Sequence, residues 1–260
     1  MSENIIFCFS GSGNSLDIAK NIGKELGDTE IVMMRKQPKV RSCQNAKTVG
    51  FVFPCYGGGA PEDFLEYVKM LSIPFTAYTY GVVTCAAYPG VGLRKLDEIV
   101  PLNYWATISH NCSCIWLFPH KLMIPAMSTK KAQARSEQLA HDVALAVKNR
   151  ETKDKDTPFN VVNDGESKVF AKLAGKKAGS FSVSDSCVSC GQCEKICPRG
   201  NIKLVDGKPS FGSNCLGCLS CLQYCPTKAI SIGKASENRE RYHNPNVSAN
   251  ELMEQVIYIK

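Results

Sequence analysis

The segments DSCVSCGQCEKICPRGNIKL (residues 185–204) and SNCLGCLSCLQYCPTKAISI (residues 213–232) are two copies of one pattern, Cys-x2-Cys-x2-Cys-x3-Cys-Pro. The second copy follows the first by 28 residues at every cysteine, so the pair forms an internal repeat. Each copy predicts a loop, a short helix and a strand. Between the copies, Asp206-Gly207 separates two extended runs and predicts a tight hairpin.

The eight cysteines of the repeat predict two 4Fe-4S clusters. Three thiolates in one tight loop bind three corners of a cubane, and the fourth, beside proline, binds the other cluster. The expected ligand sets are Cys187, Cys190, Cys193 and Cys225 for one cluster, and Cys215, Cys218, Cys221 and Cys197 for the other. Structural zinc sites use two well-separated ligand pairs and disulfide scaffolds are typical of secreted chains, so neither alternative accounts for this pattern well.

Residues 181–233 resemble a bacterial two-cluster ferredoxin, with a match at all eight ligand positions. The resemblance implies a small α+β domain that carries electrons. A unit of this size leaves most of the 260 residues unexplained, which predicts a second domain upstream. Apolar residues at 44% and charged residues at 21% are typical of a globular protein.

Residues 1–150 alternate between strand and helix patterns. We expect strands at residues 5–9, 31–33, 48–54, 78–85 and 105–108, and helices at residues 15–26, 61–71, 93–99 and 128–149. This alternation predicts an α/β fold with a doubly wound parallel sheet. Ligands of such sheets bind beyond the carboxyl ends of the strands.

The loop after the first strand is rich in hydroxyls and glycine, and it opens a helix. Its residues are Ser10, Gly11, Ser12, Gly13, Asn14 and Ser15. Small residues at a helix N-terminus favour a phosphate group, and the absence of lysine excludes a Walker A site. A dinucleotide fingerprint lacks its third glycine, because Leu16 stands there. That interpretation and an ordinary strand-helix turn remain as alternatives.

The loop SGSGNS resembles the phosphate loop of flavodoxins, and the resemblance implies FMN. Two further loops then face the flavin ring, with Pro54, Tyr56, Gly57 and Gly58 in one, and Cys85, Ala86, Ala87 and Tyr88 in the other. Tyr56 and Tyr88 are candidates for ring contact, and simple loop packing is the alternative for both. Glycine at 57 or 58 permits the redox-linked peptide reorientation that flavodoxins show.

The whole chain resembles the flavodoxin and ferredoxin fusion flavoproteins of anaerobic bacteria and archaea, the EFR-type ferredoxin family. We expect a flavodoxin-like domain at 1–150, a linker at 151–180 with a short amphipathic helix at 169–174, a ferredoxin-like domain at 181–233 and a tail at 234–260. The tail contains a capping box, Ser248 and Glu251, and can pack on either domain.

The resemblance implies an electron carrier that passes electrons between FMN and two 4Fe-4S clusters and exchanges them with redox partner proteins. One alternative is a flavin-dependent oxidoreductase acting on a small organic acceptor or NAD(P)H. Another is a ferredoxin whose flavodoxin-like domain is empty. No residue is assigned a catalytic role, and a homodimer that pairs flavin and cluster from different subunits is compatible with the sequence.

Charge and location complete the expectations. The net charge of +7 falls to about +3 when two clusters of about −2 each are counted, so it does not indicate nucleic acid. The N-terminus lacks a signal-peptide pattern, and the prolines and lysine of residues 115–127 favour a buried or lid-like loop over a membrane span. We therefore expect a cytoplasmic protein. Cys112 and Cys114, near His110, supply only half a metal site and keep no assigned role.

Overall fold

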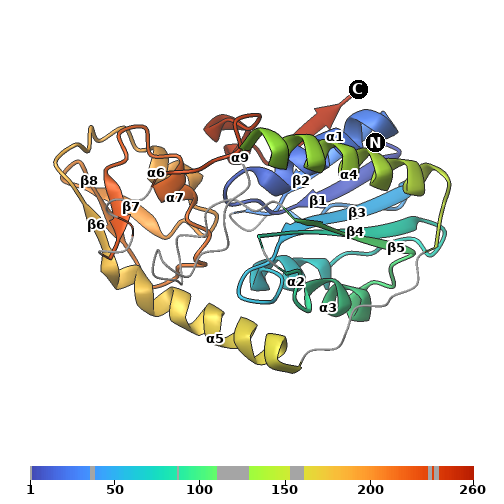
Figure 1. Cartoon of the computed structure of the whole chain (residues 1–260), viewed down its shortest axis with the longest axis horizontal. Coiled ribbons are helices and arrows are strands. Elements are labelled where there is room, and N and C mark those ends of the chain that lie inside the picture. The colour runs from blue at the N-terminus through green and yellow to red at the C-terminus, as the bar shows by residue number, and fades with distance from the viewer. Residues whose placement is uncertain are drawn as a thin grey trace.

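The protein has two lobes, seen at the right and left of Figure 1. The computed structural model describes residues 2–35, 39–86, 88–109, 129–152, 161–233, 236 and 240–260. The right lobe contains a central sheet between helices, and the left lobe contains the cysteine repeat.

The sheet of the first lobe has the strand order β10-β2-β1-β3-β4-β5. Its strands are β1 (Asn4–Cys8), β2 (Thr29–Met33), β3 (Thr48–Pro54), β4 (Tyr78–Cys85), β5 (Tyr104–Ser109) and β10 (Val256–Ile259). The pairs among β1 to β5 are all parallel. The order 2-1-3-4-5 of parallel strands is that of the flavodoxin-like doubly wound fold.

Helices cover both faces of this sheet. Helices α1 (Asn14–Leu26) and α4 (Thr129–Lys148) lie on one face, and α2 (Glu62–Val68) and α3 (Gly92–Ile99) lie on the other. Strand β1 contributes side chains to the apolar core on each face of the sheet. Ile6 and Cys8 pack with α1 and α4, whereas Ile5 and Phe7 pack with α2 and α3. Burial on both faces explains why the strands read as continuous apolar runs.

The expected elements of this lobe agree closely with the structure. The strands at 48–54 and 78–85 have the predicted bounds, and the helix at 128–149 is observed as α4. Strand β1 is one residue earlier than expected, although the Phe9 amide still donates to the Val52 carbonyl at 3.0 Å. The parallel α/β sheet is confirmed.

The second lobe follows the internal repeat. Its elements are β6 (Phe181–Val183), α6 (Gln192–Ile196), β7 (Ile202–Val205), β8 (Lys208–Phe211), α7 (Ser220–Gln223) and β9 (Ile230–Ile232). Strand β6 pairs with β9, and β7 pairs with β8. The β7–β8 hairpin turns at Asp206 and Gly207, with φ of 49° and 77°, so the predicted tight turn is confirmed as type I′.

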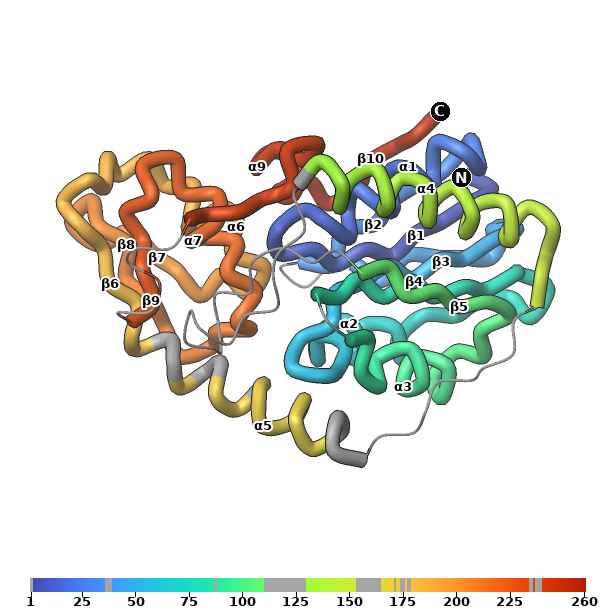
Figure 2. The backbone as a smooth tube through the Cα atoms, viewed as in Figure 1, coloured from blue at the N-terminus to red at the C-terminus, as the bar shows by residue number. Residues whose placement is uncertain are grey.

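The segment between the lobes is more helical than expected. Helix α5 (Val161–Lys177), followed by the 3-10 turn η2 (Ala178–Ser180), crosses from one lobe to the other (Figure 2). The expectation of a short amphipathic helix at 169–174 was wrong in length and in pattern, because Val169 and Leu173 are exposed and Phe170 is buried. Contacts with the first lobe, of Phe170 with Tyr56 and of Glu166 with Tyr88, support the longer helix and are not evident in the local sequence.

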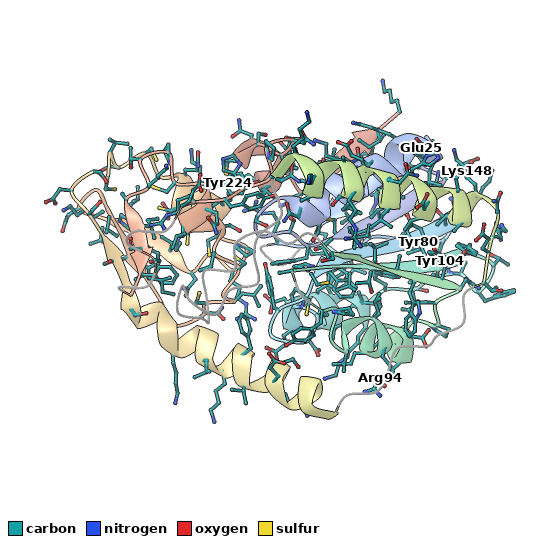
Figure 3. The ribbon with its side chains drawn as sticks, in the orientation of Figure 1. Glu25, Tyr80, Arg94, Tyr104, Lys148 and Tyr224 are labelled. Atoms are coloured by element: carbon teal, nitrogen blue, oxygen red, sulfur yellow. The ribbon has the colours of Figure 1, made fainter. Side chains whose placement is uncertain are left out.

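The C-terminal tail returns from the second lobe to the first. Helix α9 (Ala249–Met253) begins with the predicted capping box, since Ser248 accepts from the Glu251 amide and Glu251 accepts from the Ser248 amide. Strand β10 then pairs antiparallel with β2 and extends the sheet. Figure 3 places Tyr224 at the boundary of the lobes, far from the α1–α4 contact at Glu25 and Lys148.

Candidate cofactor sites

The first cysteine set gathers around one small cavity of the second lobe. Its lining includes Cys187, Cys190 and Cys193 of the first repeat, together with Cys225 of the second. The pKa of Cys193 is raised to about 11, mainly by burial and in part by charge on the neighbouring Cys190 and Cys225. Cys225 therefore lies with the cysteines of the other repeat copy.

The second set gathers nearer to the first lobe. Burial raises the pKa of Cys218 to about 12, and the neighbouring Cys197 and Cys215 add to the rise. The buried Cys221 has a raised pKa for the same reasons. Thus Cys197 lies with the cysteines of the second copy. The sulfurs form the two groups that an interleaved ligand set requires, and their assignment as cluster ligands stays a prediction.

The two cysteine loops have the same backbone shape. Left-handed residues occur at equivalent places in the two copies: Ser189 and Gly217, Gly191 and Leu219, Gly200 and Lys228. A side chain in this conformation costs about 1–2 kcal/mol, so Ser189, Leu219 and Lys228 hold a shape that their own preferences oppose. The same turns occur in both copies with different residues, so the shape belongs to this type of cysteine loop and does not depend on one particular set of residues.

Backbone amides point at the sulfurs in the same repeated way. The Asn201 amide donates to Cys197 Sγ at 3.2 Å, and the equivalent Ala229 amide donates to Cys225 Sγ at 3.3 Å. Such bonds stabilise thiolates and help to set the reduction potential of a bound cluster. Within the described ranges, no three His, Cys, Asp or Glu side chains converge closely enough for a single metal ion. The cysteines of a cubane bind separate corners and stand farther apart.

The predicted phosphate loop lies at the start of α1. Gly13 is left-handed, with φ of 96°, and no side chain caps the helix there. The Gly13 amide donates to Ser10 Oγ at 3.1 Å, and Ser15 Oγ shares a 2.8 Å hydrogen bond with Thr84 Oγ1 of β4. An uncapped helix start fits a phosphate group, although two of the three loop hydroxyls already have protein partners.

The other two predicted flavin loops meet at the same end of the sheet. The Val91 amide donates to the Gly58 carbonyl at 2.8 Å, and a Cβ on Gly90 would collide with that oxygen. Tyr56 and Gly59 close a tight turn through Gly57 and Gly58, both with positive φ. The Ala86 carbonyl accepts from Ser109 Oγ, while Ala87 lies outside the described residues.

Tyr56 lies between aromatic neighbours. Its ring contacts Phe9 edge-on and Phe170 of α5 at a tilt, each at 6.1 Å between centroids. A cavity of about 230 Å³ opens beside Tyr56 and Phe170, which is smaller than a typical ligand pocket. The Tyr88 hydroxyl donates to Glu166 of α5. Flavin binding at these loops therefore requires Phe170 to move away from Gly57, and the FMN contacts stay predictions.

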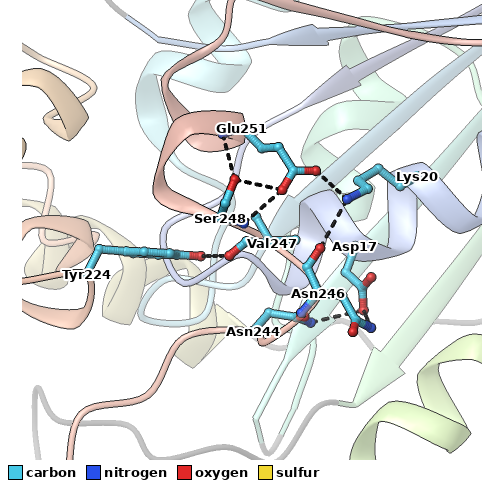
Figure 4. Close-up of polar contacts among 8 residues, drawn as sticks. All are labelled: Asp17, Lys20, Tyr224, Asn244, Asn246, Val247, Ser248 and Glu251. Atoms are coloured by element: carbon cyan, nitrogen blue, oxygen red, sulfur yellow. Dashed lines mark hydrogen bonds and ion pairs between the residues drawn. The ribbon is translucent and has the colours of Figure 1, made fainter. Parts of the chain in front are cut away.

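The tail holds the phosphate loop through residues that the sequence did not single out. The Asn244 amide donates to the Ser12 carbonyl at 2.8 Å, and its side-chain nitrogen donates to Asp17 Oδ2 at 3.0 Å. Tyr224 donates to the Ser12 carbonyl at 3.3 Å. Figure 4 shows the bond from Asn244 to Asp17, a bond from Tyr224 to the Val247 carbonyl, and the pair of Lys20 with Glu251. No local pattern predicts these contacts, because they join segments more than 200 residues apart.

Replacing Asn244 with alanine is expected to lower the free energy of unfolding by about 2 kcal/mol, because it removes a donor from the buried Asp17 carboxylate. The matched control is Asn246→Ala, since the exposed Asn246 bonds to Asp17 at only 3.4 Å. We expect the control to stay within about 0.5 kcal/mol in denaturant titrations. Equal losses in the two variants would contradict this role for Asn244.

Residues of the second cysteine set lie directly against the predicted flavin loops. A Cβ on Gly11 would lie 2.5 Å from the Tyr56 hydroxyl and 2.6 Å from the Cys218 carbonyl oxygen. Ser220 donates to the Gly11 carbonyl at 2.8 Å. Burial raises the pKa of Tyr56, and the nearby Cys218 raises it further. We call Cys197, Cys215, Cys218 and Cys221 the proximal set, and Cys187, Cys190, Cys193 and Cys225 the distal set.

The other cysteines that the structure describes form no further metal site with neighbouring His, Asp or Glu side chains. Cys8 and Cys85 are buried on strands, as expected. His110, Cys112, Cys114 and the predicted loop at residues 115–127 lie outside the described residues. Among the helices built from the described residues, none combines the length and apolar character needed to cross a membrane.

Comparison with known protein families supports the iron-sulfur prediction for the second lobe. Residues 183–203 match the family model of a 4Fe-4S binding domain. No curated protein matches the chain.

Similar solved structures include a flavodoxin from Streptococcus pneumoniae TIGR4, with 15% identity, 55% of this chain and 98% of that chain covered, and a TM-score of 0.35. An NAD(P)H:quinone oxidoreductase from Methanothermobacter marburgensis has 8% identity, coverage of 60% and 100%, and a TM-score of 0.37. A flavoprotein in complex with FMN from Lactobacillus acidophilus NCFM has 12% identity, coverage of 41% and 93%, and a TM-score of 0.33.

These TM-scores are too low to establish a fold. The fold of the first lobe follows instead from its strand order. The chain joins an N-terminal flavodoxin-like α/β domain to a small C-terminal domain with a 4Fe-4S ferredoxin motif.

Proposed function

We propose that the protein is an electron-transfer iron-sulfur flavoprotein, in which electrons pass between FMN and two 4Fe-4S clusters. The contact of Cys218 with Gly11 and Tyr56 carries this proposal, because it joins a predicted cluster ligand to two of the predicted flavin loops. The proximal set then stands between the flavin loops and the distal set. Cys190 of the distal set is exposed, which suits exchange with a redox partner protein.

The cofactors supply the redox chemistry, since FMN exchanges two electrons and each cluster exchanges one. With both cofactor types bound, the chain would connect a two-electron group to one-electron groups. The protein supplies position. Ser10 to Ser15 hold the phosphate end, the turn at Gly57 and Gly58 approaches the ring, and the eight cysteines hold the clusters.

Contacts between the lobes support a fixed arrangement. Arg199 of the second lobe donates to both carboxylate oxygens of Asp63 in α2, at 2.5 and 2.7 Å. The tail network around Asn244 holds the opposite side of the boundary. Electron tunnelling weakens steeply with distance, so a fixed spacing between the lobes favours transfer within one chain.

An oxidoreductase acting on a small organic acceptor needs access to the ring. In the structure, Phe170 lies over Gly57, and Glu166 holds Tyr88 beneath the same helix. Since Phe170 must move away from Gly57 for FMN to bind, the turnover assays below, and not this cover, separate the carrier from the enzyme. Membership of the EFR-type family, the domain limits at 150, 180 and 233, the cytoplasmic location, the redox partners and the homodimer belong to this proposal.

Anaerobic turnover assays separate carrier from enzyme. The reduced protein is mixed with quinone, NAD(P)+ or cytochrome c, the last as an artificial protein acceptor. We expect rapid oxidation by cytochrome c and little steady turnover with the small acceptors. Sustained turnover of a small acceptor, at rates above those with cytochrome c, would favour the enzyme.

A further inference from the structure

Arg35 is a buried cation at the boundary of the two lobes. It follows β2 of the first lobe and is only 6% exposed. Its guanidinium donates to the Lys195 carbonyl of α6 at 2.6 Å and to the Leu252 carbonyl of α9. Both partners are neutral, so these bonds orient the charge without balancing it.

Arg35 lies near cysteines of the proximal set, since its bond to the Lys195 carbonyl brings it to a residue two positions before Cys197. Burial lowers the pKa of Arg35, while charge on Cys197 and Cys218 raises it. Among the described residues, Arg35 forms no ion pair with a carboxylate. An isolated buried charge is costly, so the position requires a counter-charge.

Four thiolates with an oxidised cubane carry about −2, and one added electron makes this about −3. A cluster in the proximal set would therefore give Arg35 its counter-charge. Because Arg35 belongs to the first lobe and the cysteines to the second, the same attraction would act across the boundary.

Arg199 provides an internal comparison. It also stands beside the proximal set, close to Cys215, but its guanidinium pairs with the Asp63 carboxylate through two bonds. The two charges largely cancel at the cluster. Arg35 lacks such a partner among the described residues, so no neighbouring carboxylate cancels its charge at the cluster.

We propose that Arg35 is the buried counter-charge of the cluster held by Cys197, Cys215, Cys218 and Cys221, and that it raises the reduction potential of this cluster across the boundary between the lobes. Arg35 is a positioning residue that touches neither the flavin loops nor a substrate. The proposal rests on the proposed function, because it assumes that the proximal set binds a cluster.

The test compares Arg35→Met, Arg35→Lys and the double variant of Arg199→Gln with Asp63→Asn against the wild-type holoprotein. Iron content and two cluster potentials are measured in anaerobic titrations followed by EPR. We expect Arg35→Met to weaken one-electron reduction of one cluster about tenfold, equivalent to about 59 mV, and to leave the other unchanged. Arg35→Lys should restore most of the shift. Combined with Asp63→Asn, Arg199→Gln should shift the same cluster less, because the pair that is removed is neutral overall.

Several outcomes decide the proposal. Unchanged potentials in a fully loaded Arg35→Met protein would overturn it, as would equal cluster loss in Arg35→Met and Arg35→Lys, which indicates a steric role. Cluster loss in Arg35→Met alone would support it. A wild-type protein without the second cluster would instead refute the proposed function, so the two failures are distinguishable.

Discussion

Replacing Cys218 with serine is expected to remove the proximal cluster and leave FMN bound. Cys218 is partly buried and lies against Gly11 of the phosphate loop and near Tyr56, and serine keeps its approximate volume while binding iron poorly. We expect iron to fall from about eight to about four atoms per chain. Electrons placed on the flavin should then reach the distal cluster much more slowly, because the proximal cluster between them is missing.

The matched control is Cys190→Ser, which changes an exposed cysteine of the distal set. It should lose a similar amount of iron, yet flavin and the remaining cluster should still exchange electrons rapidly. Rapid-mixing absorbance, with the reductant in excess, measures both steps. Equal transfer rates in the two variants, or loss of flavin with iron intact in Cys218→Ser, would contradict the order of the clusters.

Replacing Gly13 with alanine is expected to abolish tight FMN binding and to loosen the tail. The new Cβ would lie 2.6 Å from the Tyr224 hydroxyl and 3.0 Å from Cβ of Asn244, in a left-handed residue with φ of 96°. The backbone strain alone costs about 1–2 kcal/mol, and the contacts add to it. We expect FMN affinity to fall by more than about tenfold, measured by fluorescence titration of the flavin-depleted protein.

Gly27 supplies the control for strain without crowding. It also has positive φ, 68°, but a Cβ added there would meet no atom within 4 Å. Gly27→Ala should therefore lose some stability and keep its flavin affinity. If Gly13→Ala binds FMN as tightly as Gly27→Ala does, the loop at 10–15 is not the phosphate site.

Local sequence patterns predicted the parts of the structure that depend on local interactions. The buried strands at 48–54 and 78–85, the hairpin at Asp206-Gly207 and the capping box at Ser248 follow from short-range apolar runs, turn residues and caps. The repeat spacing also predicted that Cys225 lies with the first copy and Cys197 with the second, as the structure places them, while their role as cluster ligands stays a prediction.

Contacts between distant segments could not be predicted in this way. Phe170 over Gly57, Asn244 on the phosphate loop and Arg35 beside the proximal set depend on how two lobes, α5 and the tail meet. The pairing of β10 with β2 is of the same kind, since its register involves residues more than 220 positions apart. Each of these residues lies in a segment whose own pattern indicates only linker, tail or loop.

Cofactor analysis of the anaerobically purified chain, joined to a stepwise reductive titration, tests the central claim most directly. We expect about eight irons and one FMN per chain, and an uptake of about four electrons, two by flavin and one by each cluster. Visible absorbance and EPR should show both kinds of cofactor responding. Eight irons without flavin would reduce the first domain to a scaffold, and one FMN with far fewer irons would contradict the two-cluster assignment.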